Sequence, residues 1–170
     1  MRFAGRQRAG IVVGAILGTD CALHLFWATT GSSWPATTEE SLSRGLLNAD
    51  FAFTPRVLYP LAAVLLAATL MVLTRSGLFP WLAARLPGWL PTLVTIGVGA
   101  AVLIRAIAGI VWIAGIDSST ATWFYRLNLL LYTPACLAMF AGCVAVLRSP
   151  RDQDASDARV ARRGASHAAR

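Results

Sequence analysis

Two titratable side chains in this sequence, Asp20 and His24, lie four residues apart. On a helix such residues share a face, so the carboxylate can orient the imidazole for proton transfer or for ligand binding. A third chemically active side chain, Arg105, lies thirteen residues into an apolar run that covers residues 92–116. A guanidinium at the centre of a membrane-spanning helix costs about 2.5–3.5 kcal/mol, so it usually has a partner.

The expected depth of each side chain in a membrane suggests the partner of Arg105. With a rise of about 1.5 Å per residue, Asp20 lies roughly 16 Å, Arg105 about 20 Å and His24 about 22 Å from the inner ends of their helices. We therefore predict an ion pair between Asp20 and Arg105, with His24 beside it. Such a pair either fastens the helices together or belongs to a binding site, and the sequence leaves both interpretations open.

The last apolar run adds polar groups at a similar depth. Tyr132 lies roughly 22 Å from its inner end, and Pro134 cannot donate to the carbonyl one turn back, which predicts a kink. These positions favour a polar cavity in the outer half of the protein. The predicted ligand-binding residues are Asp20, His24, Arg105 and Tyr132, and the candidate cavity walls are Trp27, Tyr59, Trp112 and Asn128.

Long apolar stretches must position these side chains. The chain has 170 residues, of which 56% are hydrophobic and 14% charged, and this is too apolar for an ordinary soluble domain. Four runs can each cross a bilayer as a helix, at residues 9–28, 57–74, 92–116 and 127–147. The sequence therefore predicts an all-α integral membrane four-helix bundle. We disfavour a cleaved signal peptide at the first run, because no clear small-x-small cleavage site follows it.

The arginines predict how the bundle is oriented. Eleven of them lie in residues 1–8, in the loop after the second run and in residues 148–170, against three in the other two loops. Short arginine-rich segments stay in the cytoplasm, so we expect both termini inside, as a head at residues 1–8 and a disordered basic tail from residue 148. These segments can contact anionic lipid. Since the arginines do not cluster on a soluble face, we expect no nucleic-acid partner.

Small residues and turn signals predict how the helices pack and how the loops fold. Gly-x-x-x-Gly spacing lets membrane helices approach closely, and it recurs in the first and third runs. The predicted packing residues are Gly10, Gly14, Gly18, Gly97, Ala101 and Gly109. In the first loop, Thr37 and Glu40 match a capping box before a short helix at residues 41–47. In the second loop, Pro80 can begin a surface turn that ends at residues 87–88.

Several chemistries are unsupported by the sequence. A single histidine within the apolar runs cannot supply two haem ligands, and no His, Cys and acid cluster has the spacing of a metal site. The three cysteines, at positions 21, 136 and 143, form no CxxC pair. There is no glycine-rich phosphate loop and no nucleophile elbow. We therefore expect no metal and no cofactor.

Two short motifs resemble those of a known family. Residues 22–28, Ala-Leu-His-Leu-Phe-Trp-Ala, and residues 131–137, Leu-Tyr-Thr-Pro-Ala-Cys-Leu, are similar to the four-span bacterial membrane proteins grouped as domain of unknown function 3995 (DUF3995). The resemblance covers most of residues 9–147, and the family's typical residues correspond to His24, Trp27, Tyr132 and Pro134. The family usually has a glycine pair after the tryptophan, where this chain has Thr30-Gly31-Ser32. The resemblance implies a bacterial cytoplasmic membrane protein and no particular activity.

Three functions are compatible with these residues. The protein binds or transports a small anionic or amphipathic molecule; or it is a structural or assembly subunit, whose charges only hold the bundle together; or it is an intramembrane enzyme in which His24 carries a proton. Transport by four helices without repeat symmetry would require a homo-oligomer. We expect binding rather than catalysis.

Overall fold

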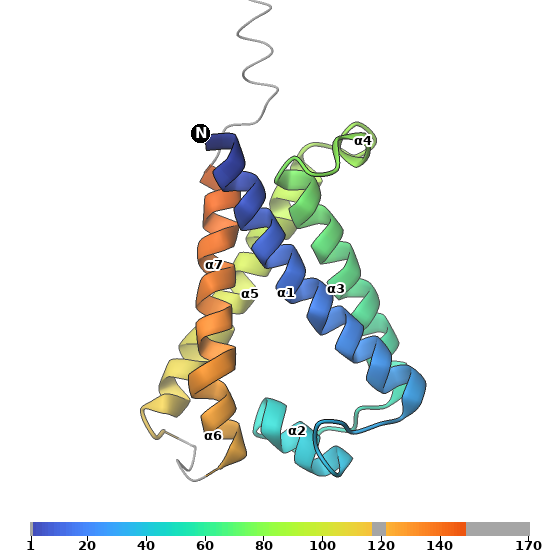
Figure 1. The fold of residues 1–170 in the computed structure, drawn as a ribbon, viewed down its shortest axis with the longest axis vertical. Helices are drawn as coiled ribbons and strands as arrows, with labels where there is room; N and C mark the ends of the chain where they lie inside the picture. The colour runs from blue at the N-terminus through green and yellow to red at the C-terminus, as the bar shows by residue number, and fades with distance from the viewer. Residues whose placement is uncertain (1, 117–121, 149–170) are drawn as a thin grey trace, which may run out of the picture.

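The computed structural model describes residues 2–116 and 122–148, and every regular element in these ranges is helical (Figure 1). The longer helices are α1 (Arg2–Thr30), α2 (Glu39–Leu47), α3 (Pro55–Arg75), α5 (Trp89–Ile113) and α7 (Thr133–Arg148). Three short elements complete the fold: α4 (Pro80–Ala83), α6 (Trp123–Leu127) and the π-helical turn η1 (Asn128–Tyr132). The tail predicted to be disordered lies outside the described residues, apart from Arg148 at the end of α7.

Four helical segments are long and apolar enough to cross a membrane: Gly5–Thr30, Pro55–Arg75, Trp89–Ile113 and Trp123–Arg148. They coincide with the four predicted runs, so the chain is a multi-pass membrane protein with an all-α fold. Their bounds differ at several ends. The first helix already begins at Arg2, so the predicted head continues this helix, and the last span begins at Trp123 because α6, η1 and α7 are continuous.

The four spans pack in two pairs. Helix α1 packs along α3, while α5 packs along α7, and further contacts join α1 to α7 and α3 to α5. Near the two ends of the described chain, residues of α1, α3 and α7 form an apolar core, with Val13, Val72 and Cys143 completely buried. Toward the opposite end α1 and α7 diverge, so the bundle is splayed there (Figure 1).

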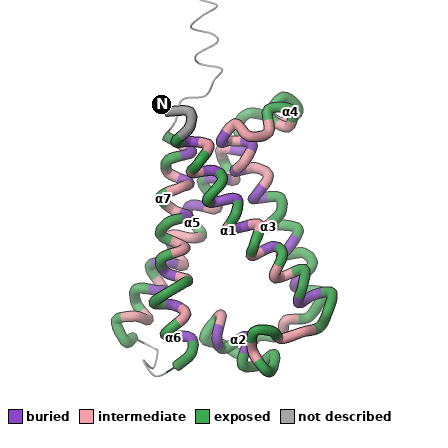
Figure 2. Tube along the Cα trace, in the orientation of Figure 1, coloured by how far each residue is buried: buried purple, intermediate pink, exposed green. Residues whose placement is uncertain are grey.

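Helix α2 lies across this splayed end (Figure 1). It is amphipathic, and its buried Leu42 packs with Trp27 and Ala28 of α1 and with Leu58 of α3. Gly45 lies so close to Trp123 of α6 that an added methyl carbon would lie 2.8 Å from the indole ring. Figure 2 shows exposed positions along the outer sides of the spans, as expected for helices that face lipid, and buried positions where the helices meet.

Candidate functional site

Arg105 lies on α5 at the edge of a cluster formed with the start of the last span. Its Nη1 atom donates a hydrogen bond to Oδ1 of Asn128 over 3.1 Å. The guanidinium carbon lies 4.9 Å from the ring centroid of Trp112 and 5.5 Å from that of Tyr132, both within cation–π range. The positive charge is therefore held by a neutral amide and two aromatic faces.

Asn128 is completely buried and joins α5 to the last span. Its Nδ2 atom donates to the backbone oxygen of Gly109 over 2.8 Å, and its Oδ1 atom also accepts a hydrogen bond from Thr133 over 3.3 Å. Only glycine fits at position 109, because an added methyl carbon would collide with the Thr133 hydroxyl. The sequence indicated Asn128 only as a cavity wall and missed Thr133, although a threonine directly before Pro134 and opposite a glycine is the available signal.

The π-helical turn η1 directly precedes the Thr133-Pro134 step, where the sequence predicts a kink. The backbone N–H of Thr133 bonds to the carbonyl of Asn128, five residues earlier. Such single π turns are frequent at functional sites, and Pro134, two residues after η1, has no N–H with which to donate to the carbonyl one turn earlier. This wider turn brings three side chains to α5: Asn128 and Thr133 lie against Gly109, and Tyr132 lies against Arg105.

Asp20 and His24 interact with each other on α1, as their spacing predicts. The Nδ1 atom of His24 lies 2.8 Å from the backbone oxygen of Asp20 and 3.4 Å from its carboxylate Oδ1. The imidazole meets the Trp27 ring edge to face at 5.4 Å. The His24 side chain is 12% exposed and that of Asp20 is 49% exposed, so the carboxylate remains accessible.

The predicted ion pair between Asp20 and Arg105 does not form. No carboxylate of the described residues lies within 4 Å of the Arg105 guanidinium, and Asp20 is instead paired with His24. A similar predicted depth was not sufficient to bring Asp20 and Arg105 together. Helix α1 packs against α3 and α7, but it diverges from the α5–α7 pair in this half of the bundle. Of the two charges, Arg105 contacts the last span, through Asn128 and the Tyr132 ring.

The remaining predicted wall residues have other surroundings. The buried Trp27 donates from Nε1 to the backbone oxygen of Trp34 over 2.7 Å and packs against Phe53, so it anchors the first loop. Tyr59 is 47% exposed near the beginning of α3. Trp112 belongs to the Arg105 cluster and meets the Phe124 ring at 5.0 Å.

The predicted packing residues divide into two groups. Gly10 lies against Ser76, Gly14 against Leu73, and Gly109 against Thr133, so these three permit close helix contacts. A side chain added at Gly18 or Gly97 would meet open space, and Ala101 is exposed, so these positions do not form the predicted contact. The sequence missed two other close positions. Gly99 packs on Cys143 and Gly142 packs on Val13, outside the four-residue stripes.

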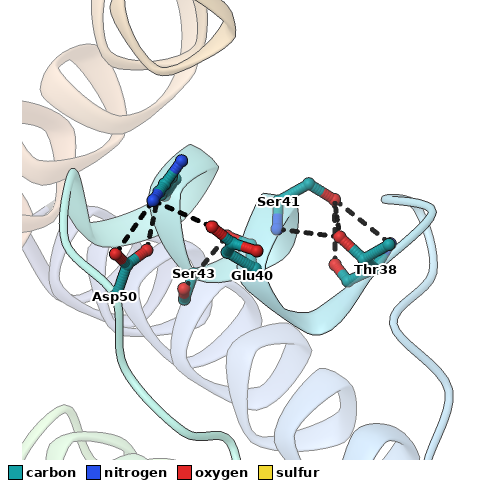
Figure 3. Close-up of polar contacts among 6 residues, drawn as sticks. Thr38, Glu40, Ser41, Ser43 and Asp50 are labelled. Atoms are coloured by element: carbon teal, nitrogen blue, oxygen red, sulfur yellow. Dashed lines mark hydrogen bonds and ion pairs between the residues drawn. The ribbon is translucent and has the colours of Figure 1, made fainter.

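Helix α2 carries a separate polar network on its outer surface (Figure 3). Its capping residue is Thr38, paired with Ser41, which corrects the prediction of Thr37 with Glu40 by one residue, because Thr38 is the last residue with extended backbone. Glu40 instead pairs with Arg44, which also binds Asp50 at 2.6 Å. The Arg44 hydrogen bond lowers the pKa of the Asp50 carboxyl below its ordinary value.

A groove of about 780 Å³ lies beside this network and is lined by α2, the neighbouring loop residues and α6. None of the predicted binding residues lines it. This groove is therefore not the polar cavity that the sequence predicts. Within the part of the chain that the structure describes, no three His, Cys, Asp or Glu side chains are grouped to hold a metal ion.

Comparison with known proteins identifies a family. No curated protein and no solved structure matches the chain. A family described as "Protein of unknown function (DUF3995)" matches residues 17–144, which include His24, Trp27, Tyr132 and Pro134. Because the match covers most of the chain, this multi-pass membrane protein belongs to the DUF3995 family.

Proposed function

We propose that the protein binds a small anionic or amphipathic molecule between α1 and η1, with Arg105 as the anion-binding group. Asp20, His24 and Tyr132 provide the other polar contacts. Transport of the same molecule would require a homo-oligomer, since a single copy has four spans and no repeat symmetry. The proposal places the site in the outer half of a bacterial cytoplasmic membrane protein with both termini inside.

The observation that carries the proposal is the incomplete neutralisation of Arg105. Its hydrogen bond goes to the neutral amide of Asn128, and no carboxylate of the described residues lies within 4 Å. Burial of a guanidinium in a membrane domain is unfavourable unless the charge is compensated, and an anion is the strongest compensation available. A bound carboxylate or phosphate would supply it.

The opposite side of the site adds selectivity. The Asp20 carboxylate is about half exposed, and His24 is oriented beside it. A ligand that carries a hydroxyl or ammonium group in addition to its anionic group can therefore contact both sides. A simple dianion would be repelled by Asp20.

The arrangement of the chain ends supports the proposed orientation. The N-terminus lies beside the end of α7, so residues 2 and 148 are at the same end of the bundle (Figure 1). Arg6 and Arg75 lie at that end and donate to the backbone oxygens of Ser76 and Leu147. This concentration of arginines is typical of a cytoplasmic side.

Native mass spectrometry of the full-length protein, purified in a mild detergent with its endogenous ligands, tests the proposal. We expect a stoichiometric anionic molecule that is retained by the wild type and by the control Arg85→Gln, an exposed arginine outside the site. The molecule should be lost in Arg105→Gln, while circular dichroism shows unchanged helicity. A wild-type protein without any bound molecule, or one whose bound molecules are all retained by Arg105→Gln, would refute the proposal.

The Asn128 network favours a second candidate, in which Arg105 only fastens the bundle. Asn128 connects Arg105 to the Gly109 backbone, so the guanidinium also stabilises the contact of α5 with the last span. Under this alternative the wild type carries no ligand, and Arg105→Gln lowers the free energy of unfolding about as much as Asn128→Leu does. Ligand binding in the wild type with a stable Arg105→Gln variant excludes it.

A further inference from the structure

A second groove, of about 470 Å³, lies where the chain enters α5. It is lined by Arg75 at the end of α3 and, on α5, by Trp89, Thr92, Leu93 and Ile96. The four α5 residues have i, i+3, i+4 and i+7 spacing, so they form one continuous stripe on that helix. The groove shares no residue with the Arg105 cluster, which begins nine residues after Ile96 on the same helix.

The chemistry of the groove changes along α5. Arg75, Trp89 and Thr92 lie toward the helix ends, whereas Leu93 and Ile96 are 57% and 50% exposed and lie deeper in the span. From Trp89 to Ile96 the stripe extends about 10 Å along the helix axis. A cation and a hydroxyl at the interface, followed by apolar side chains toward the bilayer centre, follow the order of headgroup and acyl chain in a phospholipid.

Arg75 is held in position at the polar end of the groove. Its Nη2 atom donates to the backbone oxygen of Leu147 at the end of α7 over 3.3 Å. This bond fixes the guanidinium between three helices and reduces the entropy lost when a ligand binds. The exposed Trp89 ring beside it is of the kind that lies among lipid headgroups.

We infer that this groove binds one anionic phospholipid, with its phosphate on Arg75 and an acyl chain along Leu93 and Ile96. The membrane supplies this occupant, and the positive charge at the polar end selects lipids with net negative charge. The lipid lies in the leaflet on the side of the two chain ends. This inference is independent of the proposed ligand at Arg105, because the two sites lie at opposite ends of α5.

Lipid titration of the delipidated, full-length protein tests the inference. Phosphatidylglycerol and phosphatidylcholine are added separately to the protein in a neutral detergent, and bound lipids are counted by native mass spectrometry. We expect one phosphatidylglycerol to bind at concentrations where phosphatidylcholine does not. Equal binding of the two lipids would overturn the inference.

Two substitutions locate the lipid. Arg75→Gln should weaken phosphatidylglycerol binding about fivefold. Arg85→Gln should not, because Arg85 is an exposed arginine outside the groove, between α3 and α5. Ile96→Trp fills the groove at a half-exposed position and should abolish the bound lipid without affecting folding. The matched control is Ile104→Trp, at a 69% exposed position of the same helix outside the groove.

Ile96→Trp tests the inference even if the Arg75→Gln variant does not fold. Retention of phosphatidylglycerol by a folded Ile96→Trp variant would show that the lipid does not occupy this groove. Since Arg105→Gln should keep the lipid, failure of the Arg105 proposal and failure of this inference are distinguishable.

Discussion

Replacement of Gly109 by alanine should destabilise the bundle, because the added methyl group has no space. Its carbon would collide with the hydroxyl of Thr133 and lie 3.1 Å from Oδ1 of Asn128. Neither neighbour moves easily, since Asn128 is completely buried and hydrogen-bonded to Gly109, Arg105 and Thr133. The helix or the amide must therefore shift.

The magnitude follows from three contributions. Overpacking of a tight contact costs about 1–3 kcal/mol. Loss of one hydrogen bond within the Asn128 network adds about 0.6 kcal/mol, the average measured between membrane helices. Replacement of glycine by alanine within a helix recovers up to about 1 kcal/mol. We expect Gly109→Ala to lower the free energy of unfolding by about 1–3 kcal/mol.

Gly97→Ala is the matched control on the same helix. A methyl carbon there meets nothing within 4 Å, so only the helix-propensity gain applies. Equilibrium unfolding in mixed micelles, with increasing sodium dodecyl sulfate and helicity measured by circular dichroism, gives both changes. If Gly109→Ala is as stable as Gly97→Ala, the described contact between α5 and the last span does not exist.

Three further predictions concern other contacts. Gly14→Ala should destabilise by about 1–3 kcal/mol in the same unfolding measurement while Gly18→Ala is neutral or stabilising, because only the first meets a neighbouring side chain; equal effects would contradict the packing of α1. Thr38→Ala should raise amide hydrogen exchange in the first turn of α2, since it removes the cap, at a cost of about 1 kcal/mol; unchanged exchange would exclude a stabilising cap. Because the pKa of Asp50 is lowered in the folded protein, its pairing with Arg44 contributes fully to stability above the ordinary carboxyl pKa, about 3.9, and this stability is lost as the pH falls through the lower folded pKa. The difference in melting temperature between wild type and Asp50→Asn should therefore vanish in strong acid. A difference that grows in strong acid would contradict the lowered pKa.

The outcomes for individual residues show which inferences the sequence could support. The shared face of Asp20 and His24 was predictable, because helix geometry alone relates positions four residues apart. The disruption at Pro134 was predictable for the same local reason, although its π-helical form was not. The Asn128 network joins residues far apart in the sequence, and its buried hydrogen bonds appear only when the two spans are in contact.

The packing glycines illustrate the limit of pattern recognition. The four-residue stripes include Gly14 and Gly18 alike, but only Gly14 meets a neighbouring helix. A stripe of small residues allows two helices to approach closely, but the position of the partner helix determines where along the stripe they do so. Gly18 has no such neighbour although the adjacent Leu17 belongs to the apolar core, so a place in the stripe does not by itself provide a partner.

The sequence by itself determined the four spans and the all-α membrane fold, and it predicted a depth for each polar side chain. These properties depend on local hydropathy and on a fixed rise per residue, so no knowledge of neighbours is needed. Only the tertiary structure decided which side chains meet. Asp20 and Arg105 have similar predicted depths, yet Asp20 pairs with His24 and Arg105 with Asn128. Depth gives only the position along the membrane normal, whereas helix packing determines which side chains become neighbours.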